Sequence, residues 1–193
     1  MIIKILNSIG RFINDRYNRW LLARNGVIVH GQLTINGKLY IHNQGRLEIG
    51  QMVKINSGSR YSPIGGQTQT RLIVLPGAVL RIGDNVGISN STIVAQTSVQ
   101  IEDGAMIGGS CNIWDTDFHS IDHNLRGTQD DKAKTRPIFI GKKAFIGAHS
   151  IVLKGVSVGE FSIIGAGSIV RRSIGNSAIF PNLSQAENGG RNI

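Results

Sequence analysis

The sequence predicts an all-β protein, a parallel β-helix of hexapeptide repeats with a short amphipathic helix at its N-terminus and a protruding loop. Two observations predict the coils. Positions 140, 146, 152, 158, 164 and 170 are all Ile or Val, and glycine follows four of them. The residue four places after each of the first five is small. Because an α-helix repeats about every 3.6 residues and a strand about every 2, a period of six indicates short flat faces between tight turns.

Residues 1–25 are expected to form the amphipathic helix. Asn25-Gly26 supplies a helix stop, and basic residues outnumber the single Asp15. We expect this helix to pack against the body of the protein or a neighbouring subunit; the alternative is that it rests on an anionic membrane surface. Its apolar residues recur at helical spacing: Ile2, Ile5, Ile9, Phe12, Ile13, Tyr17, Trp20 and Leu21.

Composition limits the function classes. At 193 residues the chain is long enough for one domain with a terminal appendage. The net charge of +9 indicates an anionic partner of some kind, and we expect no nucleic acid. No run approaches the ~20 apolar residues of a membrane span, and one cysteine cannot form an internal disulfide. We therefore expect a cytoplasmic protein, peripheral at the inner membrane surface if the helix contacts lipid.

The same period continues upstream. Aliphatic residues occupy positions 82, 88 and 94 and, after a slip of one residue, positions 101, 107 and 113. Thr92, Ser98 and Cys111 then fall at positions that require a small side chain, so Cys111 is predicted to fill the core rather than to act as a nucleophile. Before Ile82 the repeat is rougher, and a polar loop at 56–71 interrupts it.

The predicted β-helix spans residues 26–183, and we expect the tail at 184–193 to be disordered.

A second interruption, at 114–139, begins within the stretch "CNIWDTDFHSIDH". A loop on a rigid scaffold is a common place for catalytic groups. His119 suits a general base because neutral imidazole is plentiful near pH 7, and Asp115 or Asp117 could hold its other ring nitrogen. From the residues alone, His119 is equally well explained as an ordinary loop histidine.

A metal site is the alternative use of the histidines. His123 lies four residues beyond His119, and His149 lies in the next block of repeats. Three histidines can hold zinc, as in the β-helical carbonic anhydrases, although the metal histidines of those enzymes are arranged differently along the coils. We expect no metal.

Two segments carry a resemblance to a known family. "IGKKAFIGAHSIVLKGVSVGEFSIIGAGSIV" and, before it, "IGGSCNIWDTDFHSID" resemble the hexapeptide-repeat acyltransferases, in particular sugar O-acetyltransferases of the maltose and colanic acid type, over about Ile82 to Val170. The resemblance implies a left-handed β-helix, a homotrimer and acetyl-CoA bound in the groove between adjacent subunits. It places the catalytic histidine at His119.

The resemblance also implies a site for acetyl-CoA, the co-substrate. Arg171 and Arg172 stand where relatives often have a Thr-Lys pair near the 3′-phosphate, and Lys154 is a second candidate; the alternative is that these are solvated charges at the ends of coils. The chain departs from its relatives in reading "FPNLSQAENGG" where they continue into a Gly-Asn-Pro-Ala turn. The small positions that match the groove are Gly147, Ala148, Ala166 and Gly167.

These features predict an acetyl-CoA-dependent O-acetyltransferase that acts on a hydroxyl of a sugar or saccharide, free or lipid-linked, in surface polysaccharide biosynthesis. Transfer to an amino sugar is a variant of the same activity. A metal-dependent lyase and a non-catalytic β-helical scaffold are the alternatives from other classes. The acceptor would be recognised by loops such as 56–71 and 114–137, and the sequence does not name it.

Overall fold

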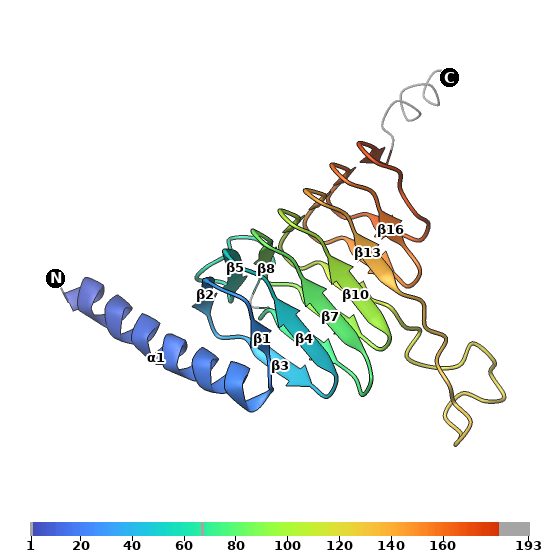
Figure 1. Cartoon of the computed structure of the whole chain (residues 1–193), viewed down its shortest axis with the longest axis horizontal. Coiled ribbons are helices and arrows are strands. Elements are labelled where there is room, and N and C mark those ends of the chain that lie inside the picture. Colours follow the sequence, from blue (N-terminus) through green and yellow to red (C-terminus); the bar gives the residue numbers. More distant parts are fainter. Residues whose placement is uncertain (1, 67, 182–193) are drawn as a thin grey trace.

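The computed structural model describes residues 2–66 and 68–181, in which one helix precedes nineteen short strands. The strands wind into stacked three-sided coils, so the chain forms a tapering prism with α1 at one end (Figure 1). All pairings between the named strands are parallel, as a β-helix requires. The tail predicted at 184–193 lies outside the described residues.

Three sheets form the sides of the prism. Sheet A contains β1 (Ile28–Val29), β4 (Arg46–Ile49), β7 (Val79–Ile82), β10 (Ser98–Ile101), β13 (Ile138–Ile140) and β16 (Ser157–Val158). Sheet B contains β2 (Leu33–Gly37), β5 (Val53–Ser57), β8 (Gly87–Ser89), β11 (Met106–Ile107), β14 (Phe145–Ile146), β17 (Ile163–Ile164) and β19 (Ile179–Phe180). Sheet C contains β3 (Tyr40–Asn43), β6 (Arg71–Val74), β9 (Thr92–Ala95), β12 (Asn112–Trp114), β15 (Ile151–Leu153) and β18 (Ile169–Val170). The chain runs from A to B to C, and we name the turns between them the A–B, B–C and C–A corners.

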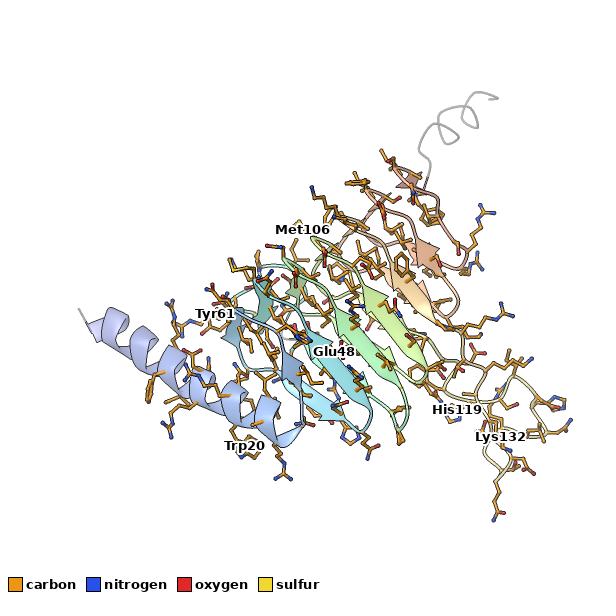
Figure 2. All side chains as sticks on the ribbon, in the orientation of Figure 1. Trp20, Glu48, Tyr61, Met106, His119 and Lys132 are labelled. Carbon is orange, nitrogen blue, oxygen red and sulfur yellow. The ribbon has the colours of Figure 1, made fainter. Side chains whose placement is uncertain are left out.

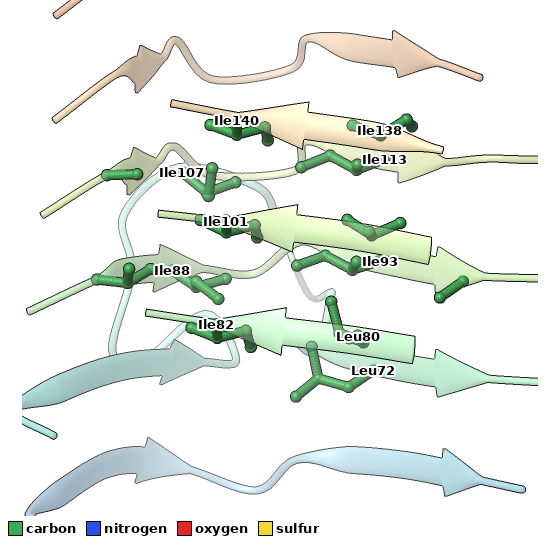
Figure 3. Packing of buried hydrophobic residues seen from close by; sticks show 14 of the residues in the cluster. Leu72, Leu80, Ile82, Ile88, Ile93, Ile101, Ile107, Ile113, Ile138 and Ile140 are labelled. Carbon is green, nitrogen blue, oxygen red and sulfur yellow. The ribbon is translucent and has the colours of Figure 1, made fainter. Parts of the chain in front are cut away.

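The core is a set of aliphatic ladders that run along the prism (Figure 3). In sheet A, Ile82 pairs with Ile101, which pairs with Ile140 on the next coil. All three side chains are almost fully buried. Because each coil stacks its aliphatic side chain on that of the coil before, the six-residue period becomes a continuous apolar column.

The predicted register is wrong by one residue in sheet C. Ile93, rather than Val94, stacks on Ile113 in the core ladder, while Val94 pairs with Trp114. The B–C corner before β9 is one residue shorter than in the coils that follow, so the slip falls between Ile88 and Ile93. Ser91 is consequently the small buried residue of this corner, and the predicted Thr92 is half-buried.

Small residues at the B–C corner link successive coils. The Ser91 hydroxyl donates to the Gly108 carbonyl and accepts from the backbone N–H of Cys111, and the Cys111 thiol lies 3.2 Å from the Gly147 carbonyl oxygen. Cys111 is fully buried, which confirms its predicted structural position. Burial raises the pKa of the Cys111 thiol above its ordinary value, so little thiolate is present near neutral pH.

The C-terminal half of helix α1 (Ile2–Arg24) packs on the first coil, and its N-terminal part projects beyond the coils, as Figure 1 shows. Leu21 joins the core, while the Asn18 amide donates to the Gly37 carbonyl and its oxygen accepts from the backbone N–H of Leu39. The predicted packing on the body is thus confirmed. The helix ends before Gly26, whose φ of 59° places it in the left-handed region.

Two loops leave the coils. The β5–β6 loop covers 58–70, and the longer β12–β13 loop covers 115–137, so Trp114 and Ile138, predicted to lie in the interruption, belong to strands. The longer loop projects from the C–A corner, well away from the prism (Figure 1). Within the described residues, no helix combines the length and the apolar content needed to cross a membrane.

Candidate active site

The projecting loop is closed at its neck by the chain itself. Thr116 pairs with Thr135 in an antiparallel bridge, and the backbone N–H of Arg136 donates to the Asp115 carbonyl over 3.0 Å. The two ends of the loop are therefore fixed to each other where they meet the C–A corner. Residues 118–133 extend beyond this neck.

Asp115 fixes the neck to the preceding coil. Its carboxylate is fully buried and accepts three backbone N–H groups, from Gln96, Thr97 and Ser98, each at 2.7 Å. The prediction that Asp115 orients His119 is therefore wrong, because its acceptor sites face the turn of the previous coil.

Asp117, predicted as an alternative partner of His119, contacts a different residue. Its Oδ1 forms an ion pair of 2.5 Å with the Nζ of Lys154, which lies at the C–A corner of the next coil. Its Oδ2 is shielded from solvent and has no hydrogen-bond partner among the described residues. Lys154 thus holds the loop through Asp117, and its predicted contact with CoA stays a prediction.

His119 is oriented by a residue that the sequence did not reveal. Its Nδ1 lies 2.8 Å from Oδ2 of Asp131, twelve residues further along the loop. The Asp131 carboxylate also accepts the backbone N–H groups of Ser120 and Gly127. His119 itself is two-thirds exposed, whereas the Asp131 side chain is 11% exposed. Figure 2 shows His119 close to the point where the loop leaves the coils.

The pKa of Asp131 is lowered to about 2 by the backbone N–H groups of Ser120 and Gly127, and then by His119. The carboxylate is therefore ionised at every pH at which an enzyme of this kind would work. An ionised carboxylate can only accept, so Nδ1 of neutral His119 must carry the ring proton. Nε2 then keeps its lone pair, on a side chain that is two-thirds exposed, as a general base requires.

Asp131 also makes the loop sensitive to acid. Because its pKa in the folded protein lies below the ordinary value of 3.8, the ionised carboxylate stabilises the folded loop above about pH 4. This contribution is lost as the pH falls through about 2.

The predicted CoA residues fall into two groups. Arg171 and Arg172 follow β18 at the C–A corner, as Lys154 follows β15, and both arginines are exposed. The four small residues lie at the B–C corner. Strands β15 and β18 of sheet C separate the two corners, so one chain does not bring all the predicted site residues together.

The small residues at the B–C corner differ in their surroundings. Gly147 is buried, and a Cβ there would lie 2.5 Å from the backbone nitrogen of Ala166, so its small size is required by coil stacking. Ala166 and Gly167 are exposed, and a Cβ on Gly167 would meet no atom within 4 Å. The Ala148 carbonyl accepts the Gly167 N–H. This accessible edge without bulky side chains fits the pantetheine arm of CoA, and the exposed arginines fit its phosphates.

A hollow of about 510 Å³ lies on the same loop, and its lining includes Ser120 and Asp130 but not His119. It combines apolar side chains with carboxylates and lysines. The residues that line it are Ser120, Ile121, Asp122, Leu125, Asp130, Lys132 and Lys134.

The remaining histidines form no cluster. His149 occupies a turn at a φ of 61° and is exposed, as is His123. In the described part of the chain, no three His, Cys, Asp or Glu side chains lie close enough to hold a metal ion.

Known proteins share parts of this sequence and this architecture. Residues 137–172 match the model of the hexapeptide repeat of succinyl-transferase. The galactoside O-acetyltransferase of Escherichia coli is 36% identical over 99 residues, which cover 51% of this chain and 47% of that protein. The chain spans about half the length of the curated relatives that it matches.

Solved structures share the fold. A hexapeptide-repeat acetyltransferase from Vibrio cholerae, complexed with acetyl-CoA, superimposes with a TM-score of 0.54 at 19% identity and covers 92% of this chain and 82% of its own. A galactoside acetyltransferase in complex with coenzyme A gives 0.55 at 23% identity, with coverages of 89% and 74%. The chain is a left-handed parallel β-helix of hexapeptide repeats, and the predicted resemblance to hexapeptide-repeat acetyltransferases is confirmed.

Proposed function

We propose that the protein is an acetyl-CoA-dependent O-acetyltransferase whose acceptor is a sugar or saccharide hydroxyl in surface polysaccharide biosynthesis. The observation that carries the proposal is the His119–Asp131 pair, which presents a free imidazole Nε2 on a loop fixed to a hexapeptide β-helix. The names of the relatives support the acetyl donor and a sugar acceptor.

The proposed reaction is direct transfer. Acetyl-CoA supplies the acetyl thioester. His119 Nε2 takes the proton from the acceptor hydroxyl as the oxygen attacks the thioester carbonyl, and Asp131 stabilises the imidazolium that forms. The proton then passes from His119 to the departing thiolate. The hollow on the loop would hold the sugar, and backbone N–H groups of the groove would stabilise the oxyanion.

We further propose that each site is shared between two copies of the chain in a homotrimer. His119, Lys154 and the two arginines lie at the C–A corner, whereas Ala166 and Gly167 lie at the B–C corner of the same chain. A neighbouring copy can supply the missing corner, and cyclic symmetry would then repeat the site at every interface.

Mixed trimers test the shared site. His119→Ala removes the base from one corner, and Ala166→Trp fills the other with a bulky ring, so each variant alone should be inactive. After co-refolding in equal amounts, about one quarter of the sites should combine an intact loop with an intact groove. Acetyl transfer should recover to that fraction of wild type.

Mixing wild type with the double variant is the matched control. Shared sites should again leave about one quarter of the wild-type activity, while sites complete within one chain would leave about one half. No recovery in the first mixture together with one half in the second would refute sharing, as would a fully active monomer.

Arg171→Ala with Arg172→Ala should raise the KM for acetyl-CoA with little change in kcat, because a remote phosphate contact acts equally in ground and transition states. Dephospho-CoA thioesters provide the control. Wild type should lose affinity on the change of donor and the double variant should not. Equal losses of affinity in wild type and the double variant would show that the 3′-phosphate binds elsewhere.

Asp131→Asn should lower kcat with little effect on the KM for acetyl-CoA. The amide introduced by this substitution can donate to Nδ1 of His119, which moves the ring proton to Nε2 and removes the base. Histidine nitrogen NMR should show the Nδ1–H tautomer in wild type and the Nε2–H tautomer in the variant. Asp131→Glu, which keeps an acceptor, should restore part of the activity; an Asp131→Asn variant with wild-type kcat would exclude the positioning role.

The activity itself is tested by thiol release from acetyl-CoA with a panel of sugars and amino sugars. An ester product identifies O-acetylation, and an amide identifies the amino-sugar variant. A trimer that transfers acetyl to no acceptor would favour the scaffold, and a chelator-sensitive hydration activity would favour the lyase.

A further inference from the structure

Helix α1 has an outward face that the fold leaves uncovered. Phe12, Ile13 and Trp20 on this helix are 63%, 52% and 54% exposed. Phe12, Arg16, Trp20 and Arg24 follow one another at intervals of four residues and therefore form a row along the helix, here called the α1 row. Trp20 extends from the side of α1 that faces away from the coils (Figure 2).

The basic and aromatic side chains of the α1 row are stacked in pairs. The Arg16 guanidinium lies 5.8 Å from the ring centroid of Phe12, and that of Arg24 lies 5.4 Å from the ring centroid of Trp20. Each pair presents an apolar ring and a fixed positive charge at the same level of the surface. This combination suits the boundary between lipid headgroups and acyl chains.

Basic residues outnumber acidic ones on the helix. Among residues 10–24, Asp15 is the single acidic residue, and it lines a hollow on the side toward the first coil together with Arg11 and Arg19. No carboxylate in this part of the helix therefore opposes an anionic surface at the α1 row. The exposed rings of Phe12 and Trp20 show that the prism does not shield the row, although this half of α1 packs on the first coil.

We propose that the α1 row docks the protein on an anionic phospholipid bilayer. The rings of Phe12 and Trp20 enter the interface, and Arg16 and Arg24 bind lipid phosphates. The opposite face of α1 remains packed on the first coil through Leu21 and Asn18, so docking requires no rearrangement of the fold. This inference is independent of the transferase activity. If that activity holds, docking brings the enzyme to lipid-linked saccharides.

Flotation of the full-length protein with vesicles tests the proposal. Wild type should bind vesicles of phosphatidylcholine with phosphatidylglycerol and bind pure phosphatidylcholine much more weakly. F12S/W20S should weaken binding at least about tenfold. R16Q/R24Q should weaken it about fivefold per arginine, with the loss abolished at high salt.

Matched controls distinguish docking through the α1 row from non-specific binding to vesicles. M52S/F161S removes two side chains of similar exposure from turns of the prism, and K142Q/K143Q removes the same charge from the A–B corner; both should bind as wild type does. Brominated acyl chains should quench the fluorescence of Trp20, and W20F, which retains Trp114, should lose that quenching.

The proposal fails if wild type does not bind anionic vesicles, or if the controls lose as much binding as the α1 variants. It also fails if F12S/W20S changes the oligomeric size in solution, because the α1 row would then be an interface between copies of the chain. Sugar acetylation in the absence of vesicles should be unchanged in F12S/W20S, so a lack of activity in wild type would bear on the proposed function alone.

Discussion

His119→Ala should lower kcat by about 10²–10⁴-fold, the usual loss when a general base is removed. The KM for acetyl-CoA should change little, because the proposed donor site is made of the groove and the arginines and does not include His119. Steady-state kinetics together with calorimetric binding of CoA measure both quantities. Because the His119 side chain is largely exposed, the substitution should leave the fold intact, and circular dichroism checks this.

The control for this prediction is Cys111→Ala, which should retain activity because the thiol is buried among the coils and its pKa is raised by burial. Direct transfer predicts no acetylated enzyme. An inactive Cys111→Ala variant, together with acetyl-Cys111 detected by mass spectrometry after incubation with acetyl-CoA alone, would instead make the cysteine the nucleophile and His119 its activator.

Asp115→Ala should destabilise the protein by roughly 3–5 kcal/mol, because three backbone N–H groups lose one buried, charged acceptor. The expected effect is a lower urea midpoint, with near-normal kcat per folded molecule. A drop in kcat without a loss of stability would instead make Asp115 a catalytic residue, as the sequence predicts.

Asp115→Asn is the conservative comparison. Its amide oxygen can still accept from Thr97 and Ser98, but its NH₂ group would face the N–H of Gln96. It should therefore lose less stability than the alanine variant. If Asp115→Ala and Asp115→Asn are equally stable, the hydrogen bonds of the Asp115 carboxylate do not stabilise this corner.

The sequence was sufficient for the coils where the corners have a constant length. From Ile140 to Val170 every corner adds the same number of residues, so the period identified the core directly. It failed at β9, where Ile93 and Val94 are both aliphatic and the corner is shorter. Periodicity cannot choose between adjacent aliphatic residues when the turn before them changes length.

The site was less predictable because its contacts do not follow the period. His119 was identified through a resemblance, whereas Asp131 contacts it through the path of an irregular loop. The partners of Asp115 are backbone N–H groups of the preceding coil, which carry no signal in the sequence. The sequence therefore identified the histidine, the acidic residues of the loop and the small corner residues as candidates. It did not identify which of them contact one another.

The neck of the projecting loop allows the loop to change in sequence without a change in the coils. Thr116 and Thr135 close the loop on itself, and strands β12 and β13 on either side keep their stacking partners in sheets C and A. Insertions, deletions or exchanges within 120–130, between His119 and Asp131, would leave every coil in place. If the proposed function holds, acceptor preference can therefore change through this segment without any change in the coils that form the proposed donor groove.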